Sequence, residues 1–191
     1  MQSDRVRRIT KRSLPAGLLL AALGIYFGGD FLFDLPPSAL AFVSEIVRAR
    51  PEGDRIAFQC EFVYRANHPH RKIYELAFVT SETSGTPPPE NASVVADGQS
   101  IPVRVQKQGF TFRLPVKGKG QETTVRIEYS LSAPQHKAVY VTRTALLWPT
   151  PIENARFELP PDAQSNYHKA GQTIAEFSEF RPKENWQIEW R

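Results

Sequence analysis

The strongest constraint in this sequence is an alternation of apolar and polar residues that begins at Arg55. The stretch "RIAFQCEFVY" places one set of side chains on a single face of an extended chain: Ile56, Phe58, Cys60, Phe62 and Tyr64. The stretch "TTVRIEYSLS" repeats the pattern with Val125, Ile127, Tyr129 and Leu131. Because successive side chains of a strand point to opposite faces, a period of two predicts strands that bury one face only.

The chain beyond these stretches reads as further short strands separated by turn residues. Asp97-Gly98 predicts a tight hairpin turn, because both positions of such a turn take a positive φ. Strands are also expected in "IYELAFVTS", "GFTFRLP", "AVYVTRTALLW", "ARFELP", "TIAEFSEF" and "NWQIEWR". About eight to ten strands without a helix predict a mainly β domain over residues 54–191, an antiparallel β-sandwich of immunoglobulin-like architecture. A closed barrel is the alternative.

An apolar segment precedes this domain. Residues 14–29, "LPAGLLLAALGIYFGG", carry no charge, and extension through "DFLFDL" to Leu35 gives 22 residues. A helix of that length rises about 33 Å, enough for a hydrocarbon core of about 30 Å. Residues 14–35 are therefore expected to form one N-terminal transmembrane helix, as an anchor or as a signal segment.

The charge of the chain is concentrated at its start. The whole sequence has 24 basic and 20 acidic residues, and residues 1–13 hold five of the former and one of the latter. The remaining 178 residues are neutral. A basic flank predicts that residues 1–13 form a cytoplasmic tail and that the β domain lies on the periplasmic or extracellular side. A neutral domain gives no support for binding nucleic acid, which needs a concentrated positive face.

The junction "PPSALAFVSEI" has two interpretations. Ser38 is a good N-cap, and Leu40, Val43 and Val47 follow at helical spacing, which predicts a short amphipathic helix up to Arg50. Residues 36–53 are then a helix and linker that lies in the membrane interface or packs on the domain.

The alternative is cleavage. Ala39-Leu40-Ala41 is a small-x-small pattern, so a signal peptidase that cuts after Ala41 would release a soluble domain. The cut lies twelve residues beyond Gly29, an unfavourable spacing for a signal peptide. The retained anchor is the favoured interpretation, and both stay open.

No pattern in the sequence identifies a catalytic site or a cofactor. His68 and His70 are weak metal candidates without an identifiable third ligand, whereas zinc sites use three or four. Cys60 lies on the apolar face of a predicted strand, where a thiol is expected to be buried and unreactive.

Five residues are candidates for interaction surfaces. Tryptophan is common at binding hot spots, although it closes the core of a sandwich more often. The predicted amphipathic helix presents two apolar side chains, and three tryptophans lie in the domain; the candidates are Phe42, Ile46, Trp148, Trp186 and Trp190.

These features predict a non-catalytic, membrane-anchored β-sandwich outside the cytoplasm. It would act as an accessory or scaffold subunit of a larger membrane complex, for example a respiratory or photosynthetic one, with membrane lipid and integral membrane protein subunits as partners. The second hypothesis is a secreted binding module released after Ala41. The third is a small metalloenzyme that uses His68 and His70.

Overall fold

The computed structural model describes residues 39–67, 72–82 and 86–191. The expected cytoplasmic tail, the apolar segment 14–35 and both His68 and His70 lie outside these residues. The first two described elements are the strands β1 (Leu40–Glu52) and β2 (Arg55–Ala66). The elements that follow are β3 (Ile73–Val79), β4 (Glu90–Ala96), β5 (Gln99–Ile101), β6 (Val103–Gln106), β7 (Gly109–Pro115), β8 (Glu122–Ser132), β9 (Lys137–Tyr140), the 3₁₀ helix η2 (Thr142–Leu147), β10 (Ile152–Glu158), β11 (Ala163–Ser165), β12 (Ile174–Phe180) and β13 (Trp186–Trp190).

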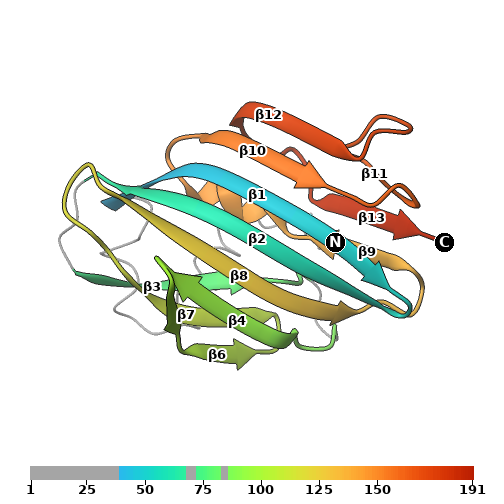
Figure 1. The fold of residues 1–191 in the computed structure, drawn as a ribbon, viewed down its shortest axis with the longest axis horizontal. Coiled ribbons are helices and arrows are strands. Elements are labelled where there is room, and N and C mark those ends of the chain that lie inside the picture. The colour runs from blue at the N-terminus through green and yellow to red at the C-terminus, as the bar shows by residue number, and fades with distance from the viewer. Residues whose placement is uncertain (1–38, 68–71, 83–85) are drawn as a thin grey trace, which may run out of the picture. The chain divides into compact units, whose positions relative to one another are not determined.

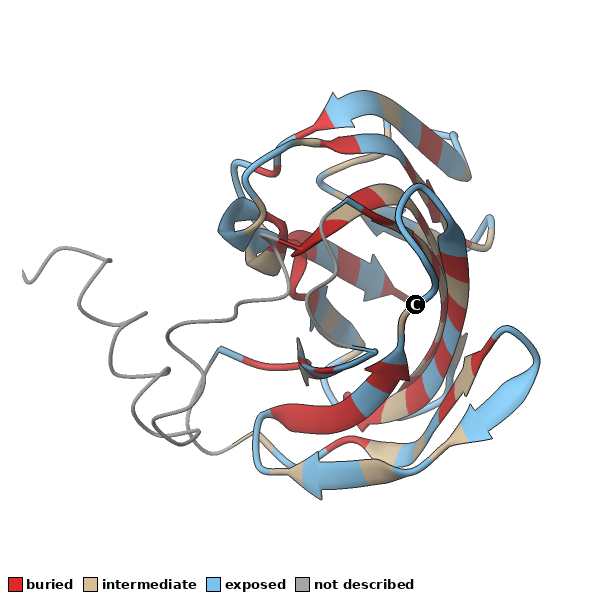
Figure 2. Cartoon of the chain, turned by 90° about the vertical axis from the view of Figure 1, so that its left-hand side faces the viewer, coloured by how far each residue is buried: buried red, intermediate tan, exposed pale blue. Residues whose placement is uncertain are grey.

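The strands form three sheets. A seven-stranded sheet has the order β12-β10-β1-β2-β8-β4-β5, and two three-stranded sheets have the orders β11-β13-β9 and β3-β7-β6 (Figure 1). Buried residues alternate with intermediate or exposed ones along the long strands β1, β2 and β8 of the large sheet (Figure 2). The buried residues of all three sheets belong to one apolar cluster. The prediction of a mainly β, multi-sheet domain consistent with a sandwich is therefore confirmed.

Aromatic rings join the large sheet to the two small ones. Phe58 of β2 stacks on Tyr129 of β8, with ring centroids 5.1 Å apart, and lies 5.6 Å from Tyr140 of β9. Phe78 of β3 contacts Tyr129 at 5.4 Å and Phe110 of β7 at 5.0 Å. Such pairs stabilise a core beyond the area that they bury. The alternating apolar residues of β2 and β8 thus form the inner surface of the large sheet, against which both small sheets pack.

The predicted amphipathic helix is wrong: these residues form β1, a central strand paired with β2 on one edge and β10 on the other. A β-bulge between Phe42 and Ser44 inserts one residue into the strand. The buried positions are therefore Leu40 and Phe42 before the bulge, and Glu45, Val47 and Ala49 after it. A bulge shifts the alternation of buried and exposed residues by one position. The buried glutamate Glu45 also breaks the apolar pattern on the inner face, so period two was not recognised in this stretch.

The β domain was expected to start at residue 54, after a helix and linker. The strand β1 (Leu40–Glu52) belongs to the compact unit Pro36–Arg191, together with the strands that follow it.

The expectation of a wholly antiparallel sheet is also wrong, because β1 and β10 are parallel. Ser44 to Arg48 pair with Asn154 to Glu158. Parallel neighbours need a long crossover connection, and here β2 to β9 and η2 lie between the two strands in the sequence. Local patterning predicts a strand but not which distant strand will lie beside it.

The stretch "AVYVTRTALLW" differs from its prediction as a single strand. It contains the short strand β9, which ends at Tyr140, and the 3₁₀ helix η2. By contrast, the predicted Asp97-Gly98 turn is confirmed, with φ of 47° and 83° at the two positions. Within the described residues, no helix has the length and apolar character needed to cross a bilayer.

Candidate functional site

Two adjacent leucines with exposed side chains lie on the turn after β9, close in space to the first residues of β1. Leu146 is 45% exposed and Leu147 is 48% exposed, while Thr142 and Ala145 form the buried side of η2. Pro149 follows Trp148 and disfavours a helical conformation there, and Trp148 is extended with ψ of 136°. We call Leu146, Leu147 and Trp148 the LLW loop. The helical turn that leads into it stands out from the core in Figure 2.

Trp148 holds the LLW loop on the sandwich. Its ring stacks on Tyr64 of β2 at 5.4 Å with an interplanar angle of 24°, and lies 5.4 Å from the ring of Phe42. Phe42 and Tyr64 are themselves 4.9 Å apart. The structure therefore brings together two predicted interaction residues, Phe42 and Trp148, at the beginning of β1.

Hydrogen bonds from the start of η2 and from Pro149, on either side of the LLW loop, hold this region to the segment 181–185. The guanidinium of Arg181 donates from Nη2 to the carbonyl of Pro149 at 2.8 Å. The hydroxyl of Thr142 donates to the carbonyl of Glu184 at 2.9 Å, and the amide of Arg143 donates to Oδ1 of Asn185 at 3.0 Å. The two leucines are consequently exposed on a well-supported turn.

The other three predicted interaction residues lie elsewhere. Trp186 is fully buried and Trp190 is 8% exposed, so both close the core from β13. Ile46 is half-buried and pairs with Arg156 and Glu61, which places it on the outer, charged face of the large sheet. Trp186 and Trp190 therefore pack in the core and are not on an interaction surface. Their alternation in "NWQIEWR" is consistent with a strand that buries one face.

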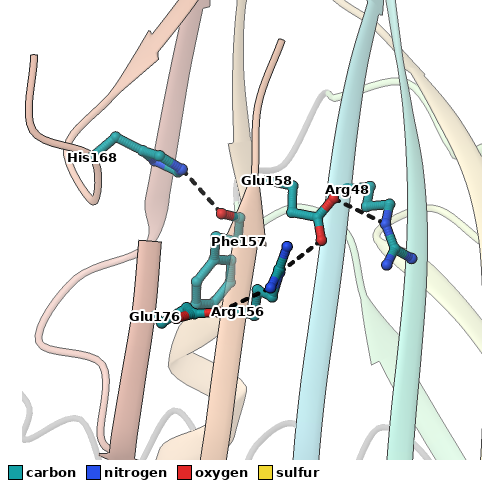
Figure 3. A network of polar contacts seen from close by, with 6 residues as sticks. All are labelled: Arg48, Arg156, Phe157, Glu158, His168 and Glu176. Carbon is teal, nitrogen blue, oxygen red and sulfur yellow. Dashed lines mark hydrogen bonds and ion pairs between the residues drawn. The ribbon is translucent and has the colours of Figure 1, made fainter. Parts of the chain in front are cut away.

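A serine–histidine pair lies beside Trp186. Nε2 of His168 is 3.0 Å from the carbonyl of Phe157 (Figure 3), and because a carbonyl only accepts, Nε2 carries the proton. Nδ1 therefore accepts from the hydroxyl of Ser165 at 2.7 Å. Burial lowers the pKa of His168, which favours this neutral form, against the opposing effect of its backbone hydrogen bonds.

The geometry of Ser165 does not suit nucleophilic attack. Its oxygen accepts from Nε1 of Trp186 at 2.8 Å and from the amide of Tyr167 at 3.2 Å. A hydroxyl has two acceptor lone pairs, and both are engaged. Ser165 thus holds the β11 turn to β13 instead of acting on a substrate.

A buried acid lies in the centre of the core. Glu45 of β1 is 4% exposed, and the hydroxyl of Tyr140 donates to its Oε1 at 2.7 Å. Burial raises the pKa of Glu45 to about 7, and the hydrogen bond from Tyr140 opposes this shift. Cys60 is buried as expected, and burial raises the pKa of its thiol. Sequence reasoning missed Glu45, although period two after the bulge places it with Val47 and Ala49.

The outer face of the large sheet carries ion pairs that cross three strands (Figure 3). Glu158 of β10 accepts from Nε of Arg48 of β1 at 3.0 Å and from Nε of Arg156 at 2.8 Å. Arg156 also donates to Glu176 of β12 at 2.9 Å. Exposed pairs of this kind contribute little to stability. The two arginines and two glutamates balance in charge, so the cluster does not form a binding site for an anion or a cation.

Among residues 39–67, 72–82 and 86–191, no group of three or more His, Cys, Asp or Glu side chains is arranged to hold a metal ion.

Parts of two solved M1 zinc metallopeptidase structures are similar to this fold. A mutant from Deinococcus radiodurans bound to a Tyr-Ser-Ala substrate has a TM-score of 0.50 and 12% identity, over 79% of this chain and 42% of that chain. A two-domain M1 zinc metallopeptidase mutant bound to L-tryptophan has the same TM-score and identity, over 79% of this chain and 43% of that one. Native leukotriene A4 hydrolase from Saccharomyces cerevisiae has a TM-score of 0.48 and 12% identity, over 81% of this chain and 29% of that one.

No protein-family model and no curated protein matches the sequence. The chain spans less than half the length of these solved structures. At 12% identity, the likeness to the two M1 zinc metallopeptidase structures shows a shared fold alone.

Proposed function

We propose that this chain is a non-catalytic, membrane-anchored β-sandwich outside the cytoplasm, which serves as an accessory or scaffold subunit of a larger membrane protein complex. The observation that carries the proposal is the position of β1. This strand is paired on both edges in the middle of the large sheet and begins at Leu40, five residues after the apolar segment ends at Leu35.

Five peptide units reach about 18 Å at most. A domain tethered so closely stays beside the bilayer and has little freedom to search for distant ligands. This short connection suits a subunit that holds neighbouring membrane proteins in place.

The polar clusters of the domain support a non-catalytic role. The hydroxyl of Ser165 has both lone pairs engaged, and Glu45 is enclosed by the core. Glu45 thus lacks the access that a substrate needs, and the oxygen of Ser165 has no lone pair free to attack one.

The burial of residues before Phe42 argues against release by a cut after Ala41. Ala39 is 1% exposed and Leu40 is 2% exposed. The carbonyl of Ala39 accepts from the amide of Asn67 at 2.9 Å. A cut after Ala41 removes these contacts from the centre of the large sheet.

Membrane fractionation of the full chain tests the proposal. We expect the chain to stay in the membrane pellet after an alkaline carbonate wash, and the variant Leu23→Arg to be released, because a charge near the centre of the apolar segment opposes insertion. Val105→Ser, a change of an exposed residue in the domain, is the control.

Gentle detergent extraction followed by a native gel tests the scaffold role. We expect a band well above the 21.6 kDa of the chain, with integral membrane proteins in it. A lone monomer contradicts the role in a complex, and a mature N-terminus at Phe42 contradicts the anchor.

A further inference from the structure

The LLW loop presents apolar surface at the end of the domain where the tether attaches. Its two leucines are about half exposed, and the ring of Trp148 lies against Phe42, two residues from the start of β1. Among the described residues, four other large apolar side chains are similarly exposed, but they are scattered singly over four different strands: Ile73, Val105, Val139 and Ile174. Scattered exposed residues are ordinary, whereas adjacent ones on a supported turn need a reason.

The composition of the loop matches the interfacial layer of a membrane. Tryptophan is favoured at the level of the headgroups, and leucine in the outer acyl region. The stretch Thr142–Ile152 contains one basic residue, Arg143, and no acidic residue. A second guanidinium, that of Arg181, is bonded to the carbonyl of Pro149. The acidic side chain of Glu82 nearby accepts from Asn185.

We propose that the LLW loop inserts into the interface of a bilayer containing acidic phospholipids, with Arg143 and Arg181 facing the phosphates. This inference rests on the proposed function, because it requires the domain to be tethered to a membrane. The tether of five peptide units keeps the loop at high local concentration beside the bilayer, so a small apolar contact suffices. A protein partner would need about 800 Å² on each side for a stable interface, far more than three side chains supply.

The tryptophans of this chain make a direct test possible. The sequence has three, and none lies in residues 14–35. Trp186 and Trp190 are buried in the core, which leaves Trp148 as the natural reporter. The full chain is incorporated into nanodiscs, one chain per disc, made of phosphatidylcholine and phosphatidylglycerol with and without bromine on the upper acyl carbons. Bromine quenches tryptophan fluorescence only at short range.

We expect brominated lipid to lower the emission of the wild-type chain and to leave that of Trp148→Phe unchanged. The double variant Leu146→Ser/Leu147→Ser should lose most of the quenching, and Arg143→Gln/Arg181→Gln should lose it in part, in discs with phosphatidylglycerol. Val105→Ser, with a matched exposure of 49%, should behave as wild type.

Three results overturn the inference: no quenching, quenching that persists in Trp148→Phe, or quenching unaffected by the leucine changes. If the first result comes with a blue-shifted emission from Trp148, protein covers the loop in place of lipid. Failure of the chain to co-elute with the discs is a different outcome, since it contradicts the membrane anchor and therefore the proposed function itself.

Discussion

Glu45 makes the stability of this domain fall as the pH rises through neutrality. The carboxyl is enclosed between the large sheet and β9, and its pKa rises from an ordinary value of 4.5 to about 7 because burial disfavours the charge. Between these values the folded state holds a proton on Glu45 and the unfolded state does not. The unfolded state therefore binds fewer protons, and the free energy of unfolding decreases with pH.

The size of the effect follows from the two pKa values. Each unit of pH between 4.5 and about 7 lowers the free energy of unfolding by about 1.4 kcal/mol. Over this range the free energy of unfolding falls by about 3 kcal/mol in total. This stability is fully present below pH 4.5, where Glu45 is protonated in both states, and is lost above about pH 7, where it is ionised in both. That is a large part of the 5–15 kcal/mol typical of a domain.

The variant Glu45→Gln isolates this contribution. Glutamine keeps the shape and an oxygen that accepts from Tyr140, but it does not titrate. Urea unfolding of the full chain in mild detergent, followed by tryptophan emission, is measured from pH 4.5 to 8 for both proteins. The difference between variant and wild type cancels other groups such as His168, whose lowered pKa acts in the opposite direction.

We expect the stability of Glu45→Gln relative to wild type to rise by about 3 kcal/mol from pH 4.5 to 8. The matched control Glu61→Gln removes a carboxylate that bonds Arg126 on the outer face, so it separates burial from the loss of charge. A difference between Glu45→Gln and wild type that is flat with pH would refute the reasoning.

Three further substitutions test the fold. Gly109→Ala should destabilise the domain by about 3 kcal/mol or more, because φ is 154° and a Cβ there meets the carbonyl of Phe78; an unchanged thermal midpoint would exclude this contact. Leu40→Ala should cost about 2–5 kcal/mol in urea unfolding, since Leu40 is 2% exposed, and a cost below 1 kcal/mol would mean that β1 begins later. Ser165→Ala should cost about 1–3 kcal/mol by leaving Nε1 of Trp186 without an acceptor; wild-type stability in calorimetry would show that this hydrogen bond is dispensable.

Local alternation was enough to predict most of the β domain. The inner faces of β2 and β8 are those that period two indicated, because both strands lie in the middle of a sheet with one face on the core and one in solvent. The Asp97-Gly98 turn was equally predictable, since few residue pairs tolerate its two positive φ angles. The burial of Cys60 follows from its place in the same alternation.

Of the candidate interaction residues, the sequence identified Trp148 but not the two leucines before it. Leu146 and Leu147 were assigned to a strand interior, and they are exposed because Thr142 and Ala145 take the buried side of η2. Trp186 was open to either interpretation, and it is buried because β13 pairs with both β9 and β11.

The sequence by itself determined that β2 and β8 bury one face, because side-chain period is a local property of the backbone. Only the tertiary structure decided that residues 40–52 form a strand, that β10 lies parallel to it and that Glu45 points into the core. These outcomes depend on which distant segments satisfy the backbone hydrogen bonds of β1. The bulge between Phe42 and Ser44 and the buried carboxyl of Glu45 were sufficient to hide these outcomes from the local pattern.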